Sequence, residues 1–99
     1  MMINKKRDKN KMTIEVSGRL DIDSSHELEK EIMEVVPEIS ELILDFKDLE
    51  YISSSGLRLI LTVQKAIEIK KGKLIIKNVN SFVMDVFKTT NIIKLLDIQ

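Results

Sequence analysis

The chain has 99 residues, with 16 basic and 16 acidic side chains, one histidine and no cysteine. This length predicts one domain, residues 1–99, and the composition excludes disulfides, thiolate metal sites and sites with several histidines. A formal net charge of zero argues against a general binder of nucleic acid, and the lack of a long apolar segment predicts a cytoplasmic protein without direct membrane insertion.

Two strands are predicted at the start of the chain. Met12–Ser17 alternates apolar and polar residues, which is typical of a half-buried strand, and this strand is expected to end at Gly18. Residues 3–5 are predicted to pair with it, and the polar residues 6–10 are predicted to form the turn between the two strands.

The first helix is predicted at Asp23–Val36. Ser24 and Glu27 have the spacing of a capping box, apolar residues follow at helical spacing, and a proline, Pro37, ends the element. The apolar run Glu41–Phe46 then predicts a central strand that is buried on both faces, as in a parallel sheet.

A loop is expected at residues 47–52, and a second helix is predicted to begin within Ser53–Gly56. Apolar residues cover most of the circumference of this helix, which indicates that it packs between other elements. A glycine, Gly72, is predicted to end the helix in the left-handed conformation.

A strand at Lys73–Val79 and a third helix capped by Asn80 or Ser81 are predicted next. Asn91 is expected to end this helix in the left-handed conformation, and the apolar tail at residues 92–98 is expected to pack back on the body. The alternation of strands and helices predicts an α/β fold with a mostly parallel sheet.

The segment Tyr51–Leu61, with the sequence YISSSGLRLIL, is the strongest candidate for a functional site. It places three serines and a glycine where a helix begins, and the first turn of a helix has unpaired amides and the positive end of the helix dipole. A phosphate added to a serine there is tolerated locally while it changes the surface charge. The alternative is that Ser53, Ser54 and Ser55 only cap the helix.

The order of the elements, the GRLD turn at Gly18–Asp21, the ELILDF strand and the YISSSGLRLIL helix start together resemble the STAS domain family. The resemblance extends from about Met12 to Ile98 and is strongest to the stand-alone members, the bacterial anti-sigma-factor antagonists. It implies a STAS-like fold, with a mixed, mostly parallel sheet of about four to five strands and at least three helices.

The junction in this family often reads D-S-S-G-L. Alignment on Gly56 places Ser55 on the serine that the family phosphorylates, and Ser54 is the second candidate. Ser53 stands where the family has an aspartate, which removes a charge beside the acceptor. The partner-binding residues that the resemblance implies are Asp21, Asp23, Ser24, Tyr51, Ser53, Ser54, Gly56 and Arg58. The family frequently has glycine at the position of Arg58, whose side chain is able to pair with a phosphate on Ser55 or with Glu50.

The resemblance implies a non-enzymatic partner switch that needs no metal or cofactor. The unphosphorylated form binds an anti-sigma factor that is also a serine kinase, and a sigma factor is released. Phosphorylation of Ser55 abolishes this binding, and a PP2C-type phosphatase restores it. The strongest alternative is a STAS scaffold or accessory subunit, of a stress-signalling complex or a lipid ABC transporter, that does not switch by phosphorylation.

Three other functions have less support. A hydrolase needs a base beside its serine nucleophile, but His26 is predicted to be solvated and no G-x-S-x-G motif is present. A phosphate-binding enzyme needs a glycine-rich loop, and the Walker pattern is missing. The basic stretch Lys5–Lys11 has no aromatic side chain to stack on bases and is better explained as a solvated hairpin turn.

The charges are unevenly distributed along the chain. Residues 1–11 carry five basic and one acidic side chain, residues 12–57 carry three and twelve, and residues 58–99 carry eight and three. Four acids of the middle segment are expected to lie near Ser55 if the loops converge: Asp21, Asp23, Asp48 and Glu50. A phosphate among these carboxylates would make the surface more negative and would weaken partner binding.

Overall fold

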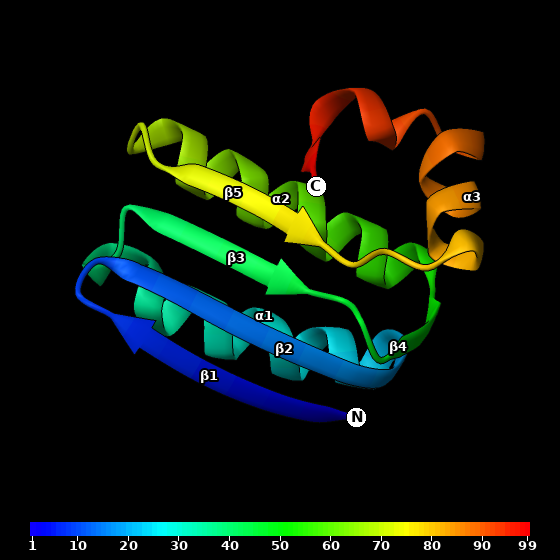
Figure 1. Ribbon diagram of the computed structural model, residues 1–99, viewed down its shortest axis with the longest axis horizontal. Coiled ribbons are helices and arrows are strands. Elements are labelled where there is room, and N and C mark those ends of the chain that lie inside the picture. The colour runs from blue at the N-terminus through cyan, green and yellow to red at the C-terminus, as the bar shows by residue number, and fades with distance from the viewer.

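A six-stranded sheet forms one layer of the molecule in the computed structural model, which describes residues 1–99 (Figure 1). Its strands are β1 (Met2–Asp8), β2 (Lys11–Leu20), β3 (Glu41–Asp45), β4 (Leu49–Ile52), β5 (Lys73–Lys77) and β6 (Asp97–Ile98). The order across the sheet is β1-β2-β3-β5-β6, and β4 pairs with the far end of β2. All neighbouring strands are parallel except β1 and β2. The predicted α/β class is confirmed, with six strands instead of four to five.

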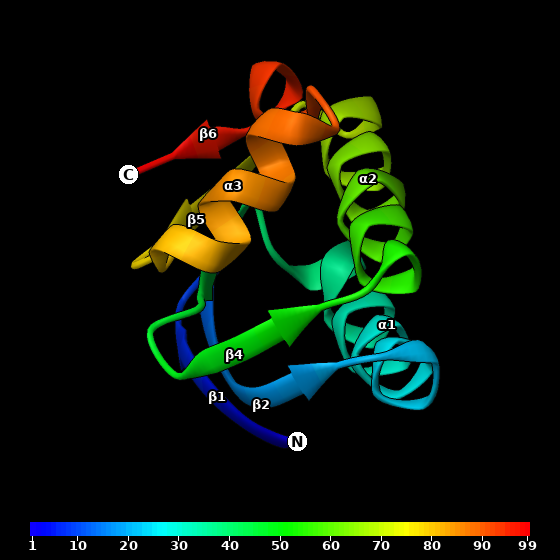
Figure 2. The same cartoon turned by 90° about the vertical axis from the view of Figure 1, so that its right-hand side faces the viewer.

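Two long helices on one face of the sheet form the second layer. They are α1 (Ile22–Val35) and α2 (Ser54–Ile69), and a shorter helix, α3 (Ser81–Thr89), lies beside β4. Figure 2 shows α1 and α2 side by side, with their first turns at the end of the molecule where β4 lies. Two short 3-10 turns follow α1 and α3, at Val36–Glu38 and Ile92–Leu95. The main apolar core lies between the sheet and the two long helices.

The central strand β3 is buried on both faces, as predicted. Leu42 and Leu44 belong to the main apolar cluster, whereas Ile43 points to the opposite side of the sheet, and all three are buried. On that opposite side Ile43 pairs in register with Thr13 of β2 and Ile75 of β5. Flanking strands on both sides therefore shield β3 from solvent.

The N-terminal hairpin differs from the prediction. The polar residues belong to β1, which continues to Asp8, and the chain turns at Lys9 and Asn10, with Lys9 at a φ of 58°. An edge strand tolerates these polar residues because its side chains reach solvent. The next strand, β2, continues past Gly18 to Leu20. The glycine has a φ of 90° where the pairing shifts register, so it makes a bulge instead of ending the strand.

Four of the five basic side chains of the hairpin pair with carboxylates from the acidic middle of the chain. Four ion pairs connect the two segments: Lys5–Glu31, Lys6–Glu15, Arg7–Glu38 and Lys11–Glu41. The basic excess of residues 1–11 and part of the acidic excess of residues 12–57 therefore offset one another in space. The interpretation of Lys5–Lys11 as a solvated hairpin turn is correct for its exposure and for Lys9 and Asn10, but residues 5–8 and Lys11 belong to the paired strands.

The expected loop at residues 47–52 contains a strand. The strand β4 runs parallel to the last residues of β2, and its Leu49 and Ile52 side chains are buried in the core. Four residues are too few to show a periodic pattern, and their hydrogen-bond partner lies far away in the sequence. The sequence alone therefore offers no signal for this element, which carries the chain into α2.

The ends of the last elements agree in part with the predictions. Asn80 caps α3 and Asn91 has the left-handed conformation, as predicted. The left-handed residue after α2 is Lys71, at a φ of 62°, instead of Gly72. The tail packs back through Ile98 of β6, which pairs with β5, although the Leu95 side chain is 59% exposed.

Helix α2 is also less enclosed than expected. Its side chains Leu59, Ile60 and Val63 are buried, but Leu61 is only partly buried and Ile69 is 84% exposed. The expectation that apolar packing covers most of the circumference is therefore wrong at the end of the helix, where Ile69 is exposed. The first half of α2, which lies beside α1 and β4, is the better-packed part and is the part that carries the serines.

Candidate functional site

The start of α2 is fixed by Ser53, which directly follows β4. Its hydroxyl accepts a hydrogen bond from the Gly56 amide at 3.2 Å, and its carbonyl accepts one from the Leu57 amide at 3.0 Å. Its own amide donates to the carbonyl of Leu20, at the end of β2, at 2.9 Å. Ser53 thus caps the helix and connects it to the sheet. A neutral serine performs the capping that an aspartate would provide at this position, without a negative charge.

Gly56 allows the first turn of α2 to approach the sheet closely. It is buried, and a Cβ atom at this position would lie 2.7 Å from Ile52 Cγ1 and 3.0 Å from Leu20 Cδ2. A side chain would therefore push the helix start away from β2 and β4. The structure assigns Gly56 a packing role beneath the site.

Ser54 and Ser55 occupy the first two helical positions of α2. Ser54 is exposed and Ser55 is partly buried, and neither hydroxyl forms a hydrogen bond within the protein. Ser53 accepts hydrogen bonds from the amides of Gly56 and Leu57. The amides of Ser54 and Ser55 are therefore left without a partner in the helix, at the positive end of the helix dipole. Both hydroxyls are therefore available for modification at a position that favours negative charge.

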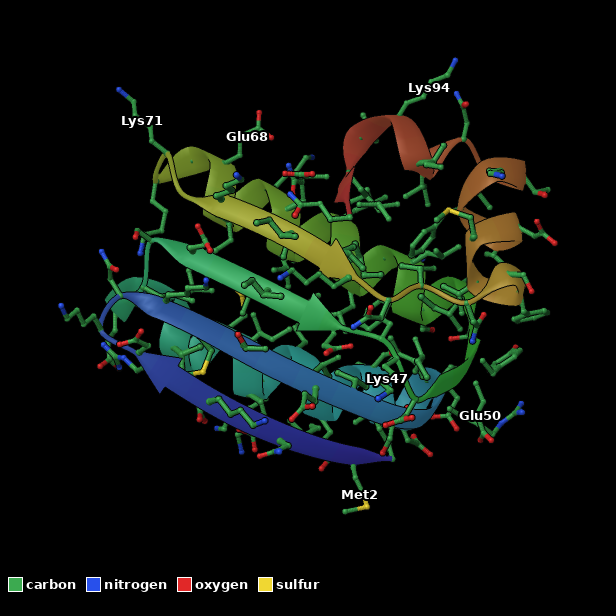
Figure 3. All side chains as sticks on the ribbon, in the orientation of Figure 1. Met2, Lys47, Glu50, Glu68, Lys71 and Lys94 are labelled. Atoms are coloured by element: carbon green, nitrogen blue, oxygen red, sulfur yellow. The ribbon has the colours of Figure 1, made fainter.

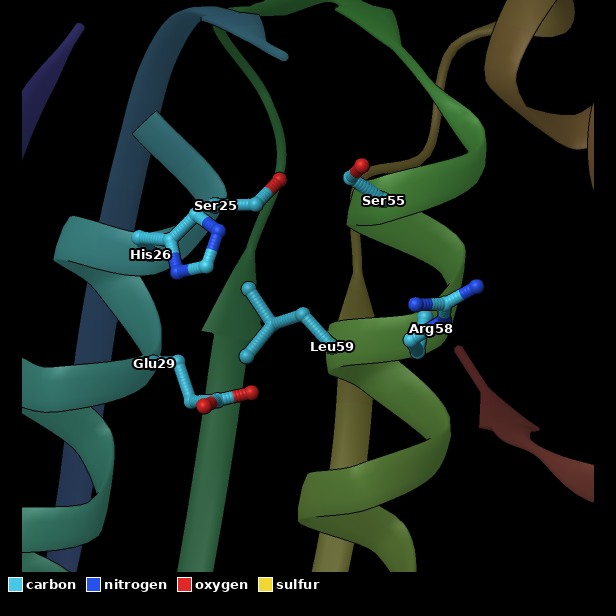
Figure 4. A pocket seen from close by; sticks show the side chains of 6 residues that line it. All are labelled: Ser25, His26, Glu29, Ser55, Arg58 and Leu59. Carbon is cyan, nitrogen blue, oxygen red and sulfur yellow. The ribbon is translucent and has the colours of Figure 1, made fainter. Parts of the chain in front are cut away.

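Ser55 lines a hollow of about 90 Å³ between the first turns of α1 and α2 (Figure 4). The other lining residues are Ser25, His26 and Glu29 from α1, and Arg58 and Leu59 from α2. His26 is exposed, as predicted, and it nevertheless shares this hollow with Ser55. No hydrogen bond joins the imidazole to the Ser55 hydroxyl, so the two side chains lack the contact that a nucleophile and its base require.

The capping box at the start of α1 differs from the predicted one. Asp21 is the cap: its carboxylate accepts from the Ser24 amide at 3.0 Å, and its amide donates to the Ser24 hydroxyl at 2.8 Å. The helix begins earlier than predicted because β2 runs on to Leu20 and the chain enters the helix at once. Ser24 is consequently buried, and its hydroxyl also donates to the carbonyl of Arg19 at 2.7 Å.

These contacts also determine the charge state of the Asp21 carboxyl group. The hydrogen bond from the Ser24 amide, and then that from the Ser24 side chain, lower the pKa of Asp21 below its ordinary value because they stabilise the carboxylate. The nearby Arg19 charge has a smaller effect in the same direction. The start of α1 therefore carries a carboxylate that stays ionised to lower pH than an ordinary aspartate, and its negative charge complements the helix dipole.

An aromatic surface lies beside the first turn of α2. The parallel pairing of β2 and β4 places Tyr51 opposite Arg19, whose guanidinium carbon lies 4.2 Å from the centroid of the tyrosine ring. Phe82 of α3 stacks on Tyr51 with the ring centroids 6.1 Å apart, and Phe82 is 48% exposed. The sequence did not predict Arg19 or Phe82 as site residues. Residues 47–52 were expected to form a loop, and a loop gives no indication of which side chains lie beside Tyr51.

The predicted site residues reach the surface to different degrees. Four are exposed, namely Asp21, Asp23, Ser54 and Arg58; Tyr51, Ser53 and Ser55 are partly buried; Ser24 and Gly56 are buried. The four acids expected around Ser55 do not line its hollow, and the carboxylate found there is that of Glu29. Arg58 and Glu50 form no ion pair, and Figure 3 shows Glu50 pointing outward at the edge of the molecule near β4.

No three His, Asp or Glu side chains are arranged to hold a metal ion, and none of the helices is both long and apolar enough to span a membrane.

The sequence matches the family model of the STAS domain over residues 2–99. The chain therefore belongs to the STAS domain family. Among curated proteins it is similar to the anti-sigma-B factor antagonist of Bacillus subtilis (strain 168). The two are 22% identical over 97 residues, which cover 98% of this chain and 89% of the relative.

Solved structures of anti-sigma factor antagonists have the same fold. SpoIIAA in its unphosphorylated form is similar with a TM-score of 0.81, at 19% identity, covering 99% of this chain and 87% of that one. The phosphorylated form of SpoIIAA, from Bacillus, has a TM-score of 0.80 at 19% identity, with 99% and 91% covered. An antagonist from Mycobacterium paratuberculosis reaches 0.87 at 18% identity, with 98% and 83% covered.

Proposed function

We propose that residues 1–99 act as a stand-alone, cytoplasmic STAS domain that is an anti-sigma-factor antagonist controlled by phosphorylation of Ser55. The observation that carries this proposal is the Ser55 hydroxyl, which has no hydrogen bond and lies at the second position of a capped helix, next to a hollow on the surface. Relatives named as anti-sigma factor antagonists support the role, and one of them, SpoIIAA, has been solved in both an unphosphorylated and a phosphorylated form.

The binding surface that we propose is the end of the molecule where the first turns of α1 and α2 meet β4. It combines the exposed serine Ser54 with the cation and aromatic rings of Arg19, Tyr51 and Phe82. Arginine and aromatic side chains contribute strongly to protein interfaces because they bury a large area, and aromatic rings also lose little conformational entropy. In the unphosphorylated form this surface binds an anti-sigma factor, which is also a serine kinase, and a sigma factor is released.

The kinase transfers a phosphoryl group from ATP to the Ser55 hydroxyl. The Oγ atom forms a new bond to the γ-phosphorus, the bond from this phosphorus to the β-phosphate oxygen breaks, and ADP leaves with the electron pair. The hydroxyl proton passes to a base of the kinase. A PP2C-type phosphatase reverses the modification with a water molecule, which releases inorganic phosphate and restores the serine.

Phosphorylation separates the partners while the fold is retained. The modified residue would add about −1.5 to −2 charges at the positive end of α2, where the helix dipole favours an anion. The same charge in a contact surface has to be desolvated, and it lies beside the carboxylate of Glu29. The switch therefore acts through the surface charge and does not need a change of backbone.

The test combines site identification with binding. The protein is incubated with ATP, Mg²⁺ and the anti-sigma factor kinases of the same organism, and the modified residue is located by mass spectrometry. We expect phosphate on Ser55, a Ser55→Ala variant that stays bound in the presence of ATP, and a Ser55→Asp variant that binds at least about tenfold more weakly. Ser54→Ala is the matched control and should still be phosphorylated and released.

Two outcomes would contradict the proposal. Equal binding of Ser55→Ala and Ser55→Asp, each with an unchanged circular dichroism spectrum, would show that charge at this position does not control the complex. A protein that carries no phosphate and copurifies with a transporter ATPase or a stress-signalling assembly would favour the non-switching STAS subunit instead.

A further inference from the structure

The hollow between the first turns of α1 and α2 contains a buried hydroxyl without a partner. Ser25 is 4% exposed, and its Oγ atom forms no hydrogen bond within the protein. In Figure 4 this hydroxyl points across the hollow toward the helix start that carries Ser55. A buried hydroxyl without a hydrogen bond is unfavourable, so an unused donor in a hollow indicates a group that binds there.

Two side chains that are able to hold an anion line the same hollow. Arg58 lies one turn after Ser55 on α2, and His26 follows Ser25 on α1. Neither forms an ion pair or a side-chain hydrogen bond within the protein, since all four ion pairs lie at the hairpin. One opposing charge, the carboxylate of Glu29, is also present.

We propose that this hollow is the intramolecular receptor for the phosphate of phosphorylated Ser55, an inference that rests on the proposed role of Ser55 as the acceptor. The Ser25 hydroxyl donates to one phosphate oxygen from α1, and the Arg58 guanidinium donates from α2. The imidazole of His26, which lines the same hollow, offers a further N–H donor. The phosphoserine is thereby held between the two helices and does not project freely into solvent.

This receptor has consequences for the switch. A docked phosphate engages Arg58 and His26, so these side chains are no longer available to a partner. The carboxylate of Glu29 opposes docking, because it repels the dianion from within the hollow. Arg58 and His26 therefore favour binding of the phosphate in the hollow and Glu29 opposes it, and substitution of each residue measures its effect separately.

The test uses the full chain with phosphoserine inserted at position 55 during translation, so that no kinase is needed. The pKa of the phosphate ester is followed by phosphorus NMR between about pH 4 and pH 8, in the folded protein and in urea. An exposed phosphoserine has a second pKa of about 6. Donors within hydrogen-bond distance favour the dianion, so we expect this pKa to be lower by about 0.5 to 1 in the folded protein than in urea.

Variants assign this effect to the hollow. Ser25→Ala, His26→Gln and Arg58→Gln are each expected to return the pKa of the phosphate toward its value in urea, whereas Glu29→Gln should lower it further. Lys65→Gln is the matched control, because Lys65 is exposed two turns beyond Arg58 on α2 and does not line the hollow. Circular dichroism establishes that each variant is folded.

A second control separates the hollow from the helix dipole. Phosphoserine at position 54 carries the same charge on the same first turn outside the hollow, and its pKa should not respond to Ser25→Ala. A phosphate at position 55 with the same pKa in folded and unfolded protein, or one that responds to none of the variants, would overturn the receptor. No partner is present in this measurement, so the receptor and the control of partner binding by Ser55 succeed or fail independently.

Discussion

The N-terminal hairpin and the end of the molecule at the first turns of α1 and α2 use charge in opposite ways. At the hairpin, four basic side chains are each paired with a carboxylate from another part of the chain. At the helix starts, Arg58, His26 and Glu29 gather around a hollow without ion pairs, and a buried hydroxyl lies unused among them. Most charges of the hairpin are therefore paired, whereas the charged side chains around the hollow have no ion-pair partner within the protein.

In a chain with no net charge, the unpaired charges are better candidates for function than the paired ones. The basic stretch Lys5–Lys11 is mostly paired, because four of its five cations form ion pairs with carboxylates of other elements. At the proposed site, Arg58, His26 and Glu29 line one hollow and form no ion pair. The pairing of charges, which depends on the fold, distinguishes the two regions better than the number of charges.

The largest expected effect concerns the packing beneath the functional end. Gly56→Val places a branched side chain against Ile52 and Leu20, so we expect the free energy of unfolding to fall by about 1–3 kcal/mol. Urea denaturation measures this loss. Ser54→Val is the control, since it adds the same side chain at an exposed neighbouring position and should change stability by about 0.5 kcal/mol or less. Equal effects of both variants would contradict the close approach of α2 to the sheet.

A smaller effect is expected from the cap of α2. Ser53→Ala removes the acceptor for the Gly56 amide and should lower the free energy of unfolding by about 1 kcal/mol. Ser53→Asp keeps the acceptor and places a negative charge at the helix start, so its stability should equal or exceed that of the natural protein. A Ser53→Ala variant with unchanged stability in thermal or urea unfolding would show that the hydroxyl does not cap the helix.

The contribution of the Asp21 cap of α1 to the free energy of unfolding is expected to depend on pH. The folded protein lowers the pKa of Asp21 through its hydrogen bonds to Ser24, so the carboxylate stabilises the fold above its unfolded pKa of about 3.9. This contribution is lost as the pH falls through the lower folded pKa. The stability difference between the natural protein and Asp21→Asn should therefore narrow from about pH 6 to about pH 2 in urea titrations. A difference that stays constant over this range would contradict the assignment.

The smallest effect is expected at the hairpin. Lys6→Gln removes an exposed ion pair with Glu15 and should lower the free energy of unfolding by about 0.2–1 kcal/mol at low salt, with a smaller effect at high salt. Arg58→Gln removes a cation without an ion pair and should stay within about 0.5 kcal/mol of the natural protein. In the partner-binding assay we expect Arg58→Gln to change the affinity for the partner and Lys6→Gln to leave this affinity unchanged. Altered binding in Lys6→Gln would extend the functional surface to the hairpin.

Most elements of the fold were predicted from the sequence because local signals specify them. The apolar run of β3 and the helical spacing of apolar residues in α1 and α2 depend on neighbours a few residues apart. Asn80 and Asn91 show their conformational roles through residue type alone. The serine cluster at the start of α2 was found for the same reason, since a helix start is readable from its cap and from the apolar residues that follow.

Other features depended on contacts between segments far apart in the chain, which no local pattern records. β4 forms because the end of β2 provides its hydrogen-bond partners. The polar β1 forms because it pairs with β2 and because acidic side chains from other elements form ion pairs with its basic residues. Ser25 and Glu29 lie one turn apart on α1, but nothing in the sequence states that this face meets the start of α2. The local pattern of residues was enough to identify the helix start that carries the serines. The side chains that surround these serines follow from the packing of α1 against α2, which brings the first turns of the two helices together.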